Sequence, residues 1–462
     1  MPLISWLPSA IDIRPGESRL VNLLLLHSFL IGINKVLLLS VSTALFLTEF
    51  GANTLPYIYI ATAVANVSVG FMYTWLGKRI SFVHLLIANL TFQFALVAVF
   101  WILFGLTDAQ WPIIGFMIAF ELLWLLTNLE FWSLSARIFN IQQGKRLFGV
   151  IGAGDTIASI IGGFSVPLIV GLIGTRNLLL PALVSILGSI AVIVVINRQF
   201  SDRLSVQQDL HIDGEPSERQ TPRRKNRYIL LIFAFACMAT ISYYFLDNAF
   251  YSFTEFQFPS NDSLTSFLGI YFAFVALAQL IVQTFFNARI INRVGITTAI
   301  ILVPVLGTVL LGATAGVALI AGTATITFIF IAATRLVEYV TRGSITYSAQ
   351  MTLYQSLPPT SRLQTEAQVE SFIEPITTGL TGILLLIVLD VLKWNAVHLI
   401  YLSMLIGLIW TVTAVFLGRE YPKALLQALS KRRLGQSQLK TKDYSIAALL
   451  KTPLMDRKAR DI

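Results

Sequence analysis

Ionisable side chains interrupt the apolar segments of this chain, where charge is expensive. Two cations and five acids lie within those segments: Lys35, Arg335, Glu121, Glu130, Asp155, Asp247 and Glu338. A charge at the centre of a membrane helix costs about 2.5 to 3.5 kcal/mol, so such residues usually face a bundle interior, a water-filled cavity or a partner charge. We expect them to line a substrate or ion path. A cavity for a polyanion would be net basic, whereas this set is net acidic.

The spacing of several polar residues predicts shared helix faces. Glu121, Asn128 and Trp132 are 7 and 4 residues apart, so one face of a single helix carries all three and should turn inward. Arg335 and Glu338 are three residues apart, so we expect them to neutralise each other. The candidate substrate-binding or coupling residues are Lys35, Glu121, Asn128, Trp132, Asp155, Asp247, Arg335 and Glu338.

Lys35 has two alternative roles at this stage. It could contact the substrate, or it could form a gating ion pair with Asp247 in the second half of the chain. We also expect a polar gate at the cytoplasmic ends of the helices, in which Glu130 pairs with Lys145 or Arg146. Its members are Glu130, Lys145, Arg146 and Arg362.

The elements that must position these residues are membrane-spanning helices. The 462 residues are 56% apolar and only 12% charged, against about 25% charged in typical globular proteins. Windows of about 20 apolar residues predict twelve spans near 20–47, 55–76, 82–105, 111–134, 147–172, 177–196, 228–251, 264–287, 297–317, 320–341, 372–392 and 396–417. The chain is therefore expected to be an all-α integral membrane protein.

The distribution of Lys and Arg predicts the orientation of the spans. Most of the net charge of +9 lies in alternate loops and in the C-terminal tail, which places both termini in the cytoplasm and argues against nucleic-acid binding. The predicted regions are a cytoplasmic N-terminus (1–19), a first half (20–196), a charged linker (197–227), a second half (228–417) and a basic tail (418–462).

The two halves repeat each other weakly and in order. Glu49 at the end of the first span has a counterpart in Glu255 after the seventh, and Glu121 has one in Glu338. Two parallel six-helix repeats predict the major facilitator architecture, with a substrate site near the midplane between the halves.

Motifs of soluble enzymes are not evident in the sequence. The run Gly149–Gly154 superficially resembles a dinucleotide loop, but no strand precedes it, so we interpret its small residues as helix-packing positions. No Walker motif is present, and Cys237 is the sole cysteine. We expect no enzymatic activity, no cofactor and no metal site.

Several local motifs give a family resemblance that spans the first to the eleventh predicted helix. They are Phe131-Trp132-Ser133, Lys145–Gly154, Ala44–Leu47 with Phe50-Gly51, and Leu353–Pro358. With these motifs the chain resembles the bacterial and plastid ATP/ADP nucleotide exchangers. That resemblance implies twelve spans, a major facilitator-like fold and exchange of ATP for ADP.

The resemblance also implies roles for single residues. Lys35 matches a lysine of the first span that meets phosphate, Glu121 matches an acidic residue of the fourth span, and Asp247 matches one of the seventh. The chain departs from the family pattern after Arg362, where Glu366 stands in place of a lysine.

Three functions remain open from the sequence. The first is a secondary transporter that exchanges nucleotides by alternating access, and the second is a proton-coupled transporter of another small solute. The third is a non-transporting scaffold that holds a protein partner through its basic tail. The expected location is a bacterial inner membrane, with a plastid or internal membrane as the alternative, and the expected partners are a small molecule and the lipid bilayer.

Overall fold

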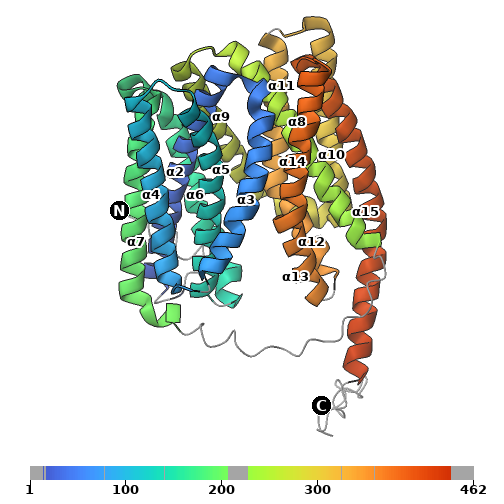
Figure 1. The fold of residues 1–462 in the computed structure, drawn as a ribbon. Helices are drawn as coiled ribbons and strands as arrows, with labels where there is room; N and C mark the ends of the chain where they lie inside the picture. Colours follow the sequence, from blue (N-terminus) through green and yellow to red (C-terminus); the bar gives the residue numbers. More distant parts are fainter. Residues whose placement is uncertain are drawn as a thin grey trace.

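The structure is a computed structural model that describes residues 14, 17–77, 79–139, 141–205, 227–323, 325–357 and 359–438. Most of the predicted N-terminus, the middle of the linker and the end of the basic tail lie outside these residues. The described elements are all helical (Figure 1).

The first half of the chain contributes six long helices. They are α2 (Ser18–Phe50), α3 (Leu55–Gly77), α4 (Phe82–Leu106), α5 (Trp111–Ile138), α6 (Ile141–Ile173) and α7 (Leu179–Ser205). Two short 3₁₀ turns, η1 (Ala52–Thr54) and η2 (Thr175–Leu178), lead into α3 and α7.

The second half contains more interrupted helices. They are α8 (Arg227–Gln257), α9 (Asn261–Ile281), α10 (Asn287–Ala321), α11 (Thr325–Thr341), α12 (Tyr347–Gln355), α13 (Pro359–Gln368), α14 (Glu374–Leu386) and α15 (Ala396–Gln438). Four π-helical segments join some of them: η4 (Val282–Phe286), η5 (Arg342–Thr346), η6 (Val369–Ile373) and η7 (Ile387–Val391).

Eleven helical segments of the described chain are long and apolar enough to cross a membrane. The predicted span 320–341 falls on α11, which has only 17 residues and contains Arg335 and Glu338. It continues through η5 into α12, which lengthens the helical path. Gly322, with φ of 58°, ends α10 and so separates the ninth predicted span from the tenth.

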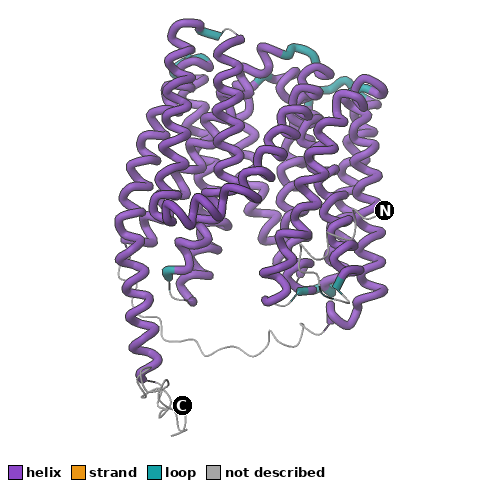
Figure 2. Tube along the Cα trace, turned by 180° about the vertical axis from the view of Figure 1, so that it is seen from behind, coloured by secondary structure: helices purple, strands orange, loops and turns teal. Residues whose placement is uncertain are grey.

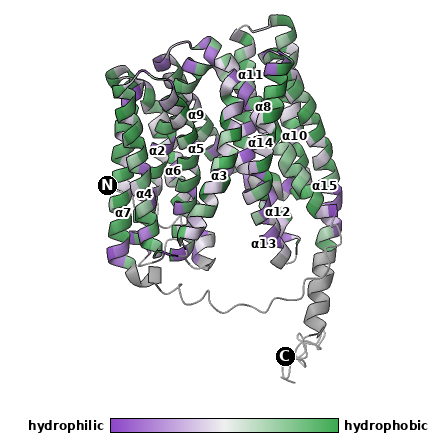
Figure 3. Ribbon diagram, viewed as in Figure 1, coloured by the Kyte–Doolittle hydropathy of each residue, from purple (hydrophilic) through white to green (hydrophobic). Residues whose placement is uncertain are grey.

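The helices form two groups that lie side by side (Figures 1 and 2). Helix α7 ends at Ser205 and α8 begins at Arg227, both on the same side of the bundle, which we call the linker face. The opposite side is the distal face. The two groups diverge toward the linker face, and α15 extends beyond it (Figure 1). Apolar residues dominate the outer flanks of the helices (Figure 3), as a lipid environment requires.

Close backbone contacts join the two halves. A Cβ atom on Gly163 of α6 would lie 2.5 Å from the carbonyl oxygen of Gly269 in α9, and one on Gly382 of α14 would lie 2.7 Å from that of Pro56 in α3. Small residues at such positions let membrane helices approach closely. The two glycine contacts therefore hold α6 against α9 and α3 against α14.

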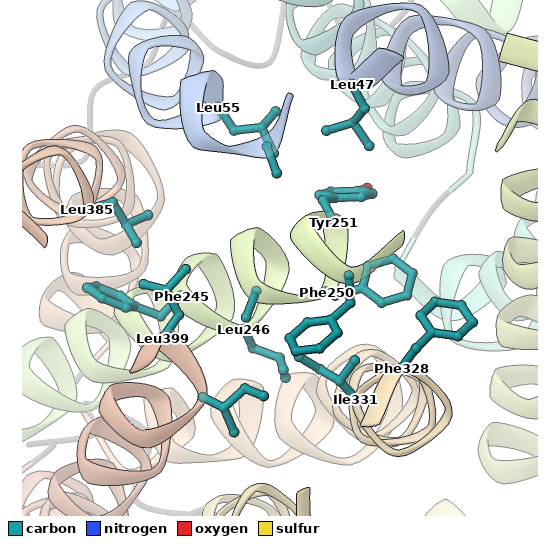
Figure 4. Close-up of a cluster of buried hydrophobic side chains, with 14 of the residues drawn as sticks. Leu47, Leu55, Phe245, Leu246, Phe250, Tyr251, Phe328, Ile331, Leu385 and Leu399 are labelled. Atoms are coloured by element: carbon teal, nitrogen blue, oxygen red, sulfur yellow. The ribbon is translucent and has the colours of Figure 1, made fainter. Parts of the chain in front are cut away.

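An apolar cluster also joins the halves, around the second part of α8 (Figure 4). Leu47 and Leu55 from the first half pack in the same buried cluster as Phe250 and Tyr251 of α8. Tyr251 lies between α8 and the first-half residues in this view (Figure 4). This cluster closes the space between the halves toward the distal face.

Candidate functional site

Lys35 lies at a pocket within the first half. Its ammonium group donates a hydrogen bond of 3.1 Å to Asn128 and lies 3.3 Å from a carboxylate oxygen of Asp155. It also lies 4.8 Å from the ring centre of Trp124, within cation–π range. The pocket is lined by Ser28, Ile31, Lys35, Asn128, Phe131, Trp132, Gly152 and Asp155.

Close packing of α2 against α6 positions Asp155 beside Lys35. A Cβ atom on Gly154 would lie 2.6 Å from the carbonyl oxygen of Leu25. The backbone N–H of Asp155 donates a 2.9 Å hydrogen bond to Ser28, which fixes the height of α6 along α2. The interpretation of this glycine-rich run as a packing motif is thus confirmed at Gly154.

Arg335 is the centre of a second charged group, in the other half. Its guanidinium donates 2.6 Å and 2.7 Å hydrogen bonds to the carboxylates of Asp247 and Glu338, and all three side chains are buried. It also lies 4.2 Å from the ring centre of Tyr243. The planar guanidinium suits this fork between two carboxylates, and a lysine could not reproduce it. The predicted pairing of Arg335 with Glu338 is confirmed.

Two further residues complete this charged group. Arg342 lies 3.9 Å from Glu338. It adds a second cation to the group that contains the carboxylates of Asp247 and Glu338. Tyr59, from α3 in the first half, donates a 3.0 Å hydrogen bond to Asp247. The charged group is therefore neutral as a whole and is tied to the other half through Tyr59.

Glu121 stands apart from both groups. Among the described residues it shares no hydrogen bond or ion pair, although it lies close enough to Asp247 and Tyr244 to interact with them electrostatically. It shares α5 with Asn128 and Trp132, as its spacing predicted. Trp132 is 45% exposed and borders the Lys35 pocket.

The structure differs from one of the two alternatives for Lys35 and from the predicted pairing of Glu130. Lys35 does not pair with Asp247. Its ammonium group contacts Asp155 and Asn128, and Asp247 instead forms an ion pair with Arg335. Glu130 contacts His27 at 3.0 Å, and both side chains are fully buried between α2 and α5. Its burial excludes Glu130 from a solvated gate in this conformation.

The other predicted gate residues lie near the linker face. Arg146 pairs with Glu17 at 3.1 Å, and Gln143 donates a 2.8 Å hydrogen bond to the same carboxylate. The hydrogen bond from Gln143 is the largest influence that lowers the pKa of Glu17, and Arg146 adds to it. Arg362 lies on α13, and the side chain of Lys145 lies outside the described residues.

Sequence reasoning missed His27, Tyr59 and Arg342 as site residues. His27 precedes Asn34 by seven residues in an apolar segment, so its helical spacing was a usable signal. Arg342 follows Glu338 by four residues, the spacing of a helical ion pair. Tyr59 had no such signal, because its partner lies in the other half. The described residues contain no group of three or more side chains placed to hold a metal ion.

The sequence matches no family model and no curated protein, but solved structures share the fold. A bacterial homologue of the iron transporter ferroportin in an inward-facing state is 14% identical with a TM-score of 0.63, covering 87% of this chain and 98% of that one. A bacterial homologue of ferroportin in an outward-facing state has a TM-score of 0.54 at 15% identity, covering 86% of this chain and 99% of that one.

Transporters of small organic solutes show similar agreement. A POT family transporter in complex with 5-aminolevulinic acid has a TM-score of 0.62 at 11% identity, covering 88% of this chain and 96% of that one. A D-xylose–proton symporter has a TM-score of 0.60 at 11% identity, with 87% and 96% covered. The chain therefore shares the major facilitator-like fold of these solved transporter structures.

Proposed function

We propose that this protein is a secondary transporter that moves a small solute across a membrane by alternating access. The major facilitator fold, the two halves and the closure on the distal side support this proposal. In it, the linker face is cytoplasmic, because basic residues gather there as the positive-inside rule expects. These include Arg79, Arg137, Arg198, Arg289 and Arg293. The host membrane in the proposal is a bacterial inner membrane.

The observation that carries the proposal is the hydrogen bond from Tyr59 to Asp247. It links the closure between the halves to a buried charged group. Protonation of Asp247, or contact between its carboxylate and a substrate, alters this bond and so biases the relative position of the halves. Intramembrane carboxylates of this kind mark proton and substrate paths.

The charges favour a neutral or cationic solute coupled to protons. Each cation of the two charged groups is matched by a carboxylate, and Glu121 adds one more acid that has no described partner. In the proposal, Glu121 or Asp247 is the titrating group. A polyanion would instead have to displace a carboxylate from Lys35 or Arg335 before it met a free positive charge.

The test uses proteoliposomes that contain a pH-sensitive dye. Sugars, nucleosides, amino acids, dipeptides and polyamines are added singly, and we expect one class to move protons with it. Glu121→Gln or Asp247→Asn should reduce that proton movement at least about tenfold, because the buried group can no longer ionise. Proton coupling would be contradicted if the rate of solute uptake did not depend on the pH gradient and were the same in Glu121→Gln and Asp247→Asn as in the parent protein.

Nucleotide exchange is the second candidate, and Lys35 is the observation that favours it. Its ammonium group borders a pocket with Trp124 and Trp132 nearby, so a phosphate and a base could both find contacts there. Labelled ATP should then enter vesicles preloaded with ADP but not empty vesicles. Lys35→Ala should abolish that exchange, whereas uptake without trans-stimulation would exclude it.

A further inference from the structure

Two turns at the distal face have the same backbone conformation. Gly51 follows α2 with φ of 75° and ψ of 164°, and Gly174 follows α6 with φ of 77° and ψ of 161°. Glycine adopts this positive φ without the penalty that a side chain imposes. Each glycine leads into a 3₁₀ turn, η1 or η2, and then into a long helix. Each turn thus presents a helix N-terminus at the boundary between the halves.

In each turn, the first N–H after the glycine is bonded by a carboxylate of the other half. Ala52 donates its N–H to Glu255 at the end of α8. Thr175 donates its N–H to Asp262 in the first turn of α9 at 3.2 Å, and its hydroxyl donates to the same oxygen at 2.7 Å. The two carboxylates lie on either side of the short connection between α8 and α9. This one segment therefore contacts both the turn before α3 and the turn before α7.

The surroundings of Glu255 strengthen its contact. Asn248 of α8 donates a 2.9 Å hydrogen bond to the carbonyl oxygen of Ala52, so Ala52 is held by both of its backbone polar groups. Glu255 also borders a small distal pocket with Leu47, Thr48, Gly51, Phe258 and Pro259. A carboxylate at a helix N-terminus gains from the helix dipole, and hydrogen bonds to a charged acceptor are roughly twice as strong as neutral ones.

We propose that Glu255 and Asp262 are two distal latches that hold the transporter closed on the side opposite the linker. Both carboxylates would have to leave the N–H groups of Ala52 and Thr175 before the distal side can open. The latches rest on the proposed alternating-access function. In this proposal, the two contacts set the ratio of the distal-closed to the distal-open state of the transporter.

Distances between spin labels on the full-length protein test the latches without a known substrate. Cys237→Ser removes the native cysteine, and exposed positions then take labelled cysteines. Ala109→Cys and Val391→Cys report across the distal face, and Ala136→Cys and Ala367→Cys report across the linker face. In lipid nanodiscs, we expect the parent protein to show mainly a short distal distance and a long linker-face distance.

Loss of a latch should reverse these populations. Glu255→Ala and Asp262→Ala should each raise the ratio of distal-open to distal-closed molecules at least about tenfold, because each removes the acceptor of a hydrogen bond between the halves. Ala52→Pro is a second route, since it removes only the N–H donor at a position where helices accept proline. Glu49→Gln is the matched control: Glu49 is also a distal acid, but it bonds to Gln110 within its own half.

Unchanged distances in Glu255→Ala, Asp262→Ala and Ala52→Pro would overturn the latches. An equal shift in Glu49→Gln would also overturn them, because it would show a general effect of distal charge. The measurement contains no transported solute, so it is separate from the dye assay. Failure of the latches leaves proton-linked transport intact, and absence of transport leaves the distance measurements valid.

Discussion

Tyr59 of α3 and Asp247 of α8 share a 3.0 Å hydrogen bond that crosses from one half of the protein to the other. The other oxygen of Asp247 accepts from Arg335, so one carboxylate serves both a contact within its half and a contact between halves. Movement of the halves apart at this depth must therefore change the polar surroundings of Asp247.

Tyr59→Phe tests this relationship. It removes the hydroxyl and leaves the ring, which packs 4.6 Å from the ring of Tyr244. Loss of a hydrogen bond to a charged group costs about 1.5 to 3 kcal/mol. We expect the ratio of distal-closed to distal-open molecules to fall about tenfold, measured with the distal spin-label pair. If Tyr59→Phe shifted the population equally with and without Asp247→Asn, the bond would have no role in closure.

Arg335→Met should destabilise the protein strongly. The change leaves Asp247 and Glu338 buried without the guanidinium that bonds to both, and removal of one partner from a buried ionic group costs about 3 to 5 kcal/mol. Thermal unfolding in detergent, followed by tryptophan fluorescence, measures the loss. The triple variant with Asp247→Asn and Glu338→Gln should recover part of it, since no buried carboxylate is then left without the guanidinium. Arg335→Lys with full stability would contradict the importance of the fork.

His27 and Glu130 should be coupled in stability. Each is fully buried, and Nδ1 of His27 and the second oxygen of Glu130 have no partner among the described residues. His27→Leu or Glu130→Met alone leaves a buried polar group and should cost about 1 to 3 kcal/mol. The double variant should cost clearly less than the sum. Exposed His84→Leu is the matched control, with an expected change below about 0.5 kcal/mol.

Glu17 should contribute a stability that depends on pH. Its pKa lies below the ordinary value of 4.5, first because Gln143 donates a hydrogen bond to the carboxylate. A lowered pKa means that the contribution is present above the unfolded pKa and is lost as the pH falls through the folded pKa. Glu17→Gln should therefore lower the melting temperature at pH 7 and have a smaller effect near pH 3.

The control for Glu17 is a second glutamate near the linker face. Glu420 pairs with Lys423, whose side chain is 67% exposed, and exposed pairs contribute little stability. Glu420→Gln should leave the melting temperature nearly unchanged at both pH values. A pH-independent loss in Glu17→Gln would instead indicate a packing role for that side chain.

The fold was accessible from the sequence because the lipid environment leaves few alternatives. A run of about 20 apolar residues must form a helix in a bilayer, so hydropathy alone gave most of the spans. The predicted span 320–341 falls on α11, which has only 17 residues around Arg335 and Glu338 and continues through η5. The pairing of those two charges was predictable because it is local.

Contacts between distant segments were much harder to predict. The spacing of Asn128 and Trp132 along α5 predicted that they share one helix face, and both line the Lys35 pocket. No local pattern could show that Asp155 rather than Asp247 lies beside Lys35. The partner of Lys35 depends on how closely α2 packs against α6, which Gly32 and Gly154 permit. Such glycines become informative only when the neighbouring helix is known.

The four π-helical segments make the halves mechanically unequal. Within the described chain they all lie between α9 and α15, and α2–α7 contain none. A π turn holds an extra residue and weakens the regular hydrogen-bond ladder, so it is an easier place to bend or to shift register. Amide hydrogen exchange should accordingly be faster in Arg342–Thr346 and Val369–Ile373 than in the middle of α5. The second half thus contains π-helical bending points that the described helices of the first half lack.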